Sequence, residues 1–212
     1  MQRAYGLEIP ETLEEVCDPR RMALLVYDMQ VGIVRHVRDA EAFTANVVRV
    51  VEATRRAGMR VLFARHLSLP NELAGVFQLR TAMAWQRVER VSEVRPLFLR
   101  DAPDFQLVPE LVPLSSEAVF DKLAMSMFVG TPLEMVLRDC GINAFAIVGA
   151  VTEIGIEPTV RHGADLGLIP VVVADACGSV DPAAGERALA SLDYALMSLR
   201  TDVDTFVGLL SS

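Results

Sequence analysis

Two charged residues stand at the ends of short apolar runs, and both could take part in proton transfer. Asp28 ends the run MALLVYD at residues 22–28, and Lys122 ends the run EAVFDK at residues 117–122. If these runs are parallel strands, both side chains lie at the carboxyl edge of the sheet, where open α/β sheets bind their ligands. Asp28 would then serve as general acid or base, with Lys122 as its partner or as a site for an anionic substrate. The alternatives are a turn residue at position 28 and a solvated lysine at position 122.

The segment VTEIGIEPT at residues 151–159 has a glycine where a nucleophile could stand. It follows another apolar run and begins a helical pattern, and α/β enzymes often keep their nucleophile at such a strand-to-helix elbow. None of the three cysteines lies at this elbow. Gly155 therefore indicates either a lost active site or a chemistry without a nucleophile, and its simplest alternative role is close packing of the helix against the sheet.

A second polar pair, Arg65 and His66, ends the run RVLFARH at residues 60–66. Arg65 is a candidate clamp for a substrate carboxylate. The histidine has no second ligand at metal-binding spacing nearby, so we expect no metal. No G-x-G-x-x-G or P-loop pattern is present, so we also expect no nucleotide cofactor.

The apolar runs alternate with segments of helical period, which predicts an α/β fold. Strands are expected at residues 22–28, 60–66, 117–122, 144–151 and 169–177. One helix is predicted to start with Thr131 as N-cap, and another to start at Asp181 and bury leucines as far as Leu199. Strands that are apolar on both faces and joined by helices predict a three-layer, doubly wound, Rossmann-like domain with a mostly parallel sheet. Residues 67–115 fit this pattern worst and are expected to cover the sheet edge or the site.

Composition limits the partners. A chain of 212 residues suits one domain, residues 1–212, with residues 1–20 as an N-terminal arm. The net charge of −8 argues against nucleic acid as partner, and no apolar run is long enough to span a membrane. The acidic charge leaves a small molecule as the expected ligand. The three cysteines are odd in number and have no metal-like spacing, which suits a reducing compartment, so a cytoplasmic location is expected.

Four segments in this order resemble the isochorismatase-like hydrolase superfamily, which includes nicotinamidases and N-carbamoylsarcosine amidases. They are ALLVYDMQVGIV, FDKLAMSMFVGTPLEMVLRDCGI, AIVGAVTEIGIEPTVRHGADLG and VVVADACGS. In most members an Asp, a Lys and a Cys form a catalytic triad, and the resemblance places Asp28, Lys122 and Gly155 at these positions. It also implies a homo-oligomer and a cis peptide bond between Ala150 and Val151.

The resemblance leaves three functions open. Hydrolysis of a vinyl ether needs a proton and a water molecule but no thiol, which suits Gly155, and we expect this chemistry without a cofactor. Hydrolysis of an amide would require water activated by Asp28, because the covalent route is closed. A binding protein without catalysis is the third possibility. Closeness to the motif positions suggests five residues for the substrate pocket: Gln30, Arg65, Phe128, Val151 and Thr152.

Overall fold

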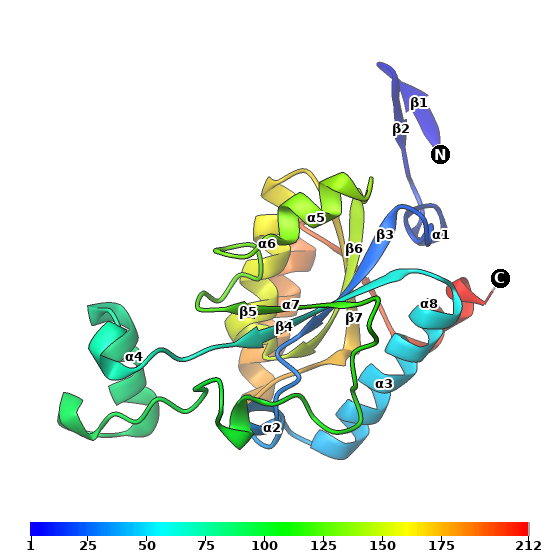
Figure 1. Ribbon diagram of the computed structural model, residues 1–212. Helices are drawn as coiled ribbons and strands as arrows, with labels where there is room; N and C mark the ends of the chain where they lie inside the picture. The colour runs from blue at the N-terminus through cyan, green and yellow to red at the C-terminus, as the bar shows by residue number, and fades with distance from the viewer. Residues whose placement is uncertain (212) are drawn as a thin grey trace.

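The centre of the protein is a parallel sheet of six strands. We describe the fold from a computed structural model, in which residues 1–211 are described. The strand order is β5-β4-β3-β6-β7-β8 (Figure 1). The strands are β3 (Met22–Tyr27), β4 (Arg60–His66), β5 (Ala118–Lys122), β6 (Ala144–Ala150), β7 (Ile169–Gly178) and β8 (Leu199–Thr201). This confirms the predicted three-layer α/β fold.

Helices cover both faces of the sheet, which explains why its central strands are apolar throughout. Every residue of β3 and β6 is buried. One face packs against α3 (Ala40–Arg56) and α8 (Val203–Leu210). The other packs against α5 (Leu133–Asp139), α6 (Glu157–Asp165) and α7 (Pro182–Tyr194). Since every strand runs the same way, the carboxyl ends of β3, β4, β5 and β6 meet at one edge.

Two predicted helix boundaries were wrong. Helix α5 begins at Leu133 and not directly after Thr131, whose hydroxyl accepts from the Leu133 N–H and donates to the Met127 carbonyl. Helix α7 starts as predicted, with the Asp181 carboxylate accepting from two backbone N–H groups, but it ends at Tyr194. Leu196 is exposed with a positive φ, and Leu199 begins strand β8. The leucine spacing thus continued across a turn and into a strand that the sequence did not reveal.

The poorly patterned stretch after β4 divides into two parts. Its first part carries a short 3-10 turn (Asn71–Leu73), helix α4 (Val76–Gln86) and a second 3-10 turn (Val91–Glu93), and it reaches away from the sheet (Figure 1). No residue of α4 is buried. The second part contains the turn Pro103–Phe105 and packs on the body beside α2 (Val31–Val34). We call residues 67–98 the α4 arm.

The N-terminal segment forms a separate small element. Strands β1 (Gln2–Ala4) and β2 (Leu7–Ile9) pair as an antiparallel hairpin, which α1 (Leu13–Val16) follows. The hairpin projects beyond the amino end of β3 (Figure 1). Among residues 1–211, no helix is long and apolar enough to cross a membrane.

Candidate active site

Asp28 lies at the carboxyl end of β3, where the chain leaves the sheet. Its φ of 44° is in the left-handed region, which aspartate tolerates better than most residues. The Asp28 N–H donates to the Ala64 carbonyl at 3.2 Å, and its own carbonyl accepts from the Gln30 N–H at 2.7 Å. These two bonds fix the turn and direct the carboxylate over the sheet edge.

Lys122 reaches the Asp28 carboxylate from β5, across the end of β4. Its Nζ lies 2.8 Å from Asp28 Oδ2 and 3.2 Å from the Ala124 carbonyl oxygen. The two side chains are 0% and 6% exposed, and Lys122 is the single lysine of the chain. Burial lowers the pKa of Lys122, while the Asp28 charge opposes this shift. Asp28 Oδ1 is buried without a hydrogen-bond partner, which leaves one carboxylate oxygen for a ligand or water.

Gly155 lies in the elbow between β6 and α6, as predicted. The peptide bond between Ala150 and Val151 is cis, as expected, and a π-helical turn (Thr152–Ile156) follows it. The Val151 carbonyl accepts from the N–H groups of Gly155 at 2.9 Å and Ile156 at 3.2 Å. The segment therefore keeps the helical entry but presents no side chain at position 155.

The space in front of Gly155 is filled by Tyr27, a residue that the sequence did not single out. A Cβ atom added at Gly155 would lie 2.0 Å from the Tyr27 hydroxyl oxygen. The Tyr27 ring also lies under the Lys122 ammonium, 4.2 Å from Nζ to the ring centroid, and its hydroxyl donates to the Met125 carbonyl. In the sequence, Tyr27 looks like one more residue of an apolar strand. The one signal of a role in the site was its position as a lone tyrosine among aliphatic residues, directly before Asp28.

Two of the predicted pocket residues use their polar groups within the protein. The Gln30 amide accepts from the His66 N–H at 2.6 Å and donates to the His66 and Phe105 carbonyls. Arg65 pairs with Asp121 at 2.8 Å and lies over the Phe105 ring. Because strand residues alternate between faces, Arg65 points to the opposite face of the sheet from Lys122. Substrate binding by Gln30 and Arg65 stays a prediction.

The other three predicted pocket residues are buried near the elbow. Phe128 packs against the rings of Phe145 and His162. Val151 follows the cis bond, and the Thr152 hydroxyl donates to the Gly178 carbonyl at 2.9 Å. All three are less than a tenth exposed, and their role in binding also stays a prediction.

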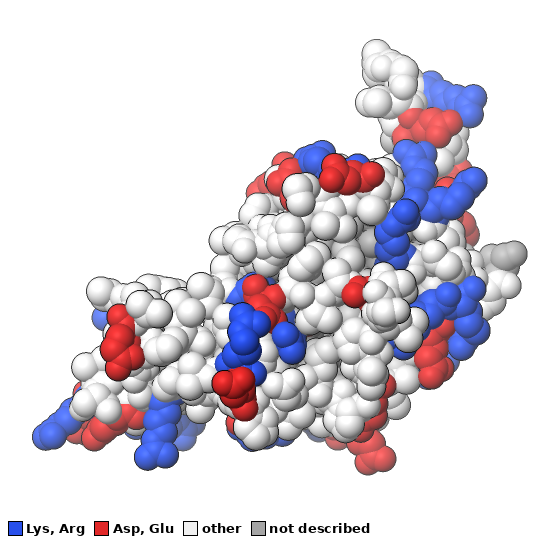
Figure 2. Space-filling model, in the orientation of Figure 1, with Lys and Arg blue, Asp and Glu red and all other residues white. Residues whose placement is uncertain are grey.

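A groove of about 450 Å³ runs between the α4 arm and the body. His66, Ala124 and Met125 are among its lining residues, whereas Asp28, Lys122 and Tyr27 are not. The Ala124 and Met125 carbonyls are the ones that accept from Lys122 and Tyr27. Most of the lining is apolar, including Phe77, Leu79, Trp85, Phe98 and Leu123, with Arg95 as its one charged arginine or lysine. On the face shown in Figure 2, most charged groups of the arm gather along the edge away from α5.

The partly buried His66 should make stability depend on pH. Burial lowers its pKa below 6.5, with the nearby Lys122 charge adding to the shift and Asp28 opposing it. Between the folded pKa and 6.5 the unfolded chain binds more protons, so the free energy of unfolding falls as the pH falls, by at most about 1.4 kcal/mol per pH unit. Urea unfolding of His66→Gln between pH 5 and 6.5 should show a weaker fall than unfolding of the parent. Equal slopes in the two proteins would contradict this assignment.

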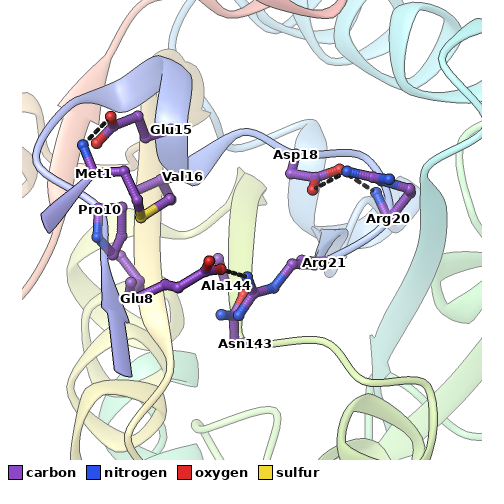
Figure 3. A pocket seen from close by; sticks show the side chains of 11 residues that line it. Met1, Glu8, Pro10, Glu15, Val16, Asp18, Arg20, Arg21, Asn143 and Ala144 are labelled. Atoms are coloured by element: carbon purple, nitrogen blue, oxygen red, sulfur yellow. Dashed lines mark hydrogen bonds and ion pairs between the residues drawn. The ribbon is translucent and has the colours of Figure 1, made fainter. Parts of the chain in front are cut away.

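A second cavity lies at the opposite edge of the sheet, beneath the N-terminal hairpin (Figure 3). It has a volume of about 280 Å³ and is lined by the start of β6 and by charged side chains. These pair with one another: Glu8 with Arg21, Asp18 with Arg20, and Glu15 with the Met1 amine. Within residues 1–211, no three His, Cys, Asp or Glu side chains converge as metal ligands would.

Comparison with known proteins gives one consistent result. The family model of the isochorismatase domain matches residues 22–202. A cysteine hydrolase from Pseudomonas syringae pv. phaseolicola 1448A is similar in structure, with a TM-score of 0.78, 22% identity, and coverage of 92% of this chain and 95% of that one. The N-carbamoylsarcosine amidase from Thermoplasma acidophilum gives a TM-score of 0.69 at 21% identity, over 87% and 97% of the two chains. Nicotinamidase from Bacillus subtilis gives 0.70 at 19% identity, over 86% and 99%.

Proposed function

Because the chain belongs to the isochorismatase family of hydrolases, we propose that it hydrolyses a small molecule without a covalent bond between enzyme and substrate. One observation carries this proposal: the buried Asp28–Lys122 contact leaves Asp28 Oδ1 free, at a site where position 155 has no nucleophile. A buried ion pair is costly to build, so its presence beside an unpaired oxygen supports a role in proton transfer.

The pair can provide both proton transfers that hydrolysis requires. Burial lowers the pKa of Lys122, so moving its proton to Asp28 costs less than it would in water. In the neutral pair Asp28 carries a proton that it can donate, and in the ionic pair its carboxylate can accept one.

Vinyl-ether hydrolysis fits this arrangement best. Asp28 protonates the vinyl carbon and leaves an oxocarbenium ion. Water adds to that ion and returns a proton to Asp28. The resulting hemiketal then breaks its C–O bond to give a ketone and an alcohol. No step needs a thiol, so Gly155 is compatible with all of them.

Amide hydrolysis is the second candidate, and the groove favours it. The groove has a mostly apolar lining with Arg95 as its one arginine or lysine, and burial lowers the pKa of His66, which also lines it. Such a lining suits an uncharged substrate better than one with several carboxylates. Water activated by Asp28 would attack the carbonyl carbon, and the C–N bond would break as the amine takes up a proton. Two structurally similar proteins are named as a nicotinamidase and an N-carbamoylsarcosine amidase.

Two parallel assays distinguish these reactions. The purified protein is given isochorismate with detection of pyruvate, and separately nicotinamide or N-carbamoylsarcosine with detection of ammonia. We expect product from one class and, in samples quenched during turnover, an unmodified protein mass. A mass increase equal to a substrate fragment would overturn the non-covalent mechanism. Binding without product for every compound would favour a non-catalytic family member.

We also propose that the protein acts as a homo-oligomer in the cytoplasm, with a small molecule rather than nucleic acid as ligand. The exposed α4 helix, apolar on several sides, is where we expect a second copy to pack. Light scattering of the purified chain would test the proposed homo-oligomer.

A further inference from the structure

We propose that Tyr27 has two structural roles in the site. Its ring occupies the space in front of Gly155, where a nucleophilic side chain would lie, and it positions the Lys122 ammonium. Tyr27 is thus a positioning residue for the proposed reaction, and this role in catalysis rests on the proposed function. Two structural statements do not depend on turnover. Positions 27 and 155 are sterically complementary, and the Tyr27 ring contacts the Lys122 ammonium.

The complementarity of Tyr27 and Gly155 is steric. A Cβ atom at position 155 would lie 2.0 Å from the tyrosine Oη, 2.3 Å from Cζ and 2.5 Å from Cε1. Real side chains do not approach this closely, so any residue larger than glycine requires the ring to move. The ring has little freedom to do so, because it is 1% exposed and its hydroxyl donates to the Met125 carbonyl. A thiol at position 155 and the phenol at position 27 therefore exclude each other.

The same ring is one of three groups that hold the ammonium. Lys122 Nζ lies 4.2 Å from the ring centroid, 2.8 Å from Asp28 Oδ2 and 3.2 Å from the Ala124 carbonyl oxygen. A cation over an aromatic face is attracted by the ring quadrupole, and the attraction grows when water is excluded. Burial, and then the Asp28 charge, raise the pKa of Tyr27 well above 10, so the phenol stays neutral beside the carboxylate.

A simple alternative is that Tyr27 only fills a void in the core. It predicts that substitutions at position 27 cost stability but do not alter the environment of Lys122. The single lysine of the chain makes the two cases separable, because protein labelled with 13C at the lysine ε-carbon gives one lysine signal. A methylene group over an aromatic face shows an upfield shift of its protons from the ring current.

The first experiment measures this signal in three proteins. Tyr27→Phe keeps the ring and should keep the upfield shift. Tyr27→Leu removes the ring, so the ε-protons should move downfield toward the position seen in urea. Should Tyr27→Leu fail to fold, Tyr27→Met serves in its place. An ε-proton position that is the same with and without the ring would overturn the positioning role.

The second experiment measures coupling between positions 27 and 155. Gly155→Ala should lower Tm by about 2–12 °C in the parent, the range expected for an overpacked core in a chain of this size. In the Tyr27→Leu background the same change should have little effect. Gly163→Ala is the matched control, since a Cβ there would meet Phe145 at 2.4 Å and not Tyr27. Its cost should be equal in both backgrounds. An equal cost of Gly155→Ala in both backgrounds would overturn the steric complementarity.

Turnover is the last measurement and separates this inference from the proposed function. With a substrate in hand, Tyr27→Leu should lower kcat more than it changes KM, and Tyr27→Phe should restore most of kcat. An unchanged kcat in Tyr27→Leu would refute the catalytic part. If no protein shows turnover while the lysine shift and the coupling hold, the proposed function fails and the structural roles of Tyr27 stand.

Discussion

Asp28→Asn should lower kcat by about 10²–10⁴-fold and leave KM nearly unchanged, which is the effect expected from removal of a general acid or base. The asparagine side chain still accepts a hydrogen bond through its oxygen, so the contact with Lys122 is retained in part and the protein should fold. It cannot carry the proton that either hydrolysis needs. The measurement is steady-state turnover of whichever substrate gives product in the assays above.

Glu117→Gln is the matched control for Asp28→Asn. Glu117 is also a buried carboxylate in an ion pair, 5% exposed and 2.8 Å from Arg55, but it lies before β5 and away from the site. The same change from carboxylate to amide there should cost stability and leave kcat unchanged. Full activity of Asp28→Asn, or an equal loss in Glu117→Gln, would remove Asp28 from the mechanism.

Asp28 and Lys122 could be identified from the sequence because each one ends an apolar run. A polar residue directly after an apolar run is visible in the sequence, and the parallel topology places all such residues at one edge of the sheet. Their direct contact could not be read, because it depends on β3, β4 and β5 being neighbours in this order. Strand order is set by which helices cross which face, and a single sequence gives no measure of that.

Tyr27 and Arg65 show two different limits of sequence reasoning. Tyr27 was missed because it counts as apolar in a periodicity argument, although its function depends on the residue that faces it 128 positions later. The orientation of Arg65 could have been predicted, because side chains alternate between the two faces along a strand. Arg65 and His66 therefore lie on opposite faces, and only one of them can share a face with Lys122. Strand β8 was missed for a third reason, since three exposed or half-exposed residues carry no strand pattern.

Lys122→Met should destabilise the protein by about 3–5 kcal/mol, because it leaves the Asp28 carboxylate buried without its partner. In the double variant Asp28→Asn/Lys122→Met both charges are gone, and stability should recover to within about 1–2 kcal/mol of the parent. Urea unfolding of the four proteins gives the coupling energy directly.

The surface pair Glu134–Arg138, 42% and 56% exposed, is the comparison, and its double-mutant cycle should give only about 0.3–0.5 kcal/mol. A double variant as unstable as Lys122→Met would show that the lysine acts through packing alone. Recovery would show instead that the fold does not need this pair, so its presence at the carboxyl edge is best explained by chemistry at the site.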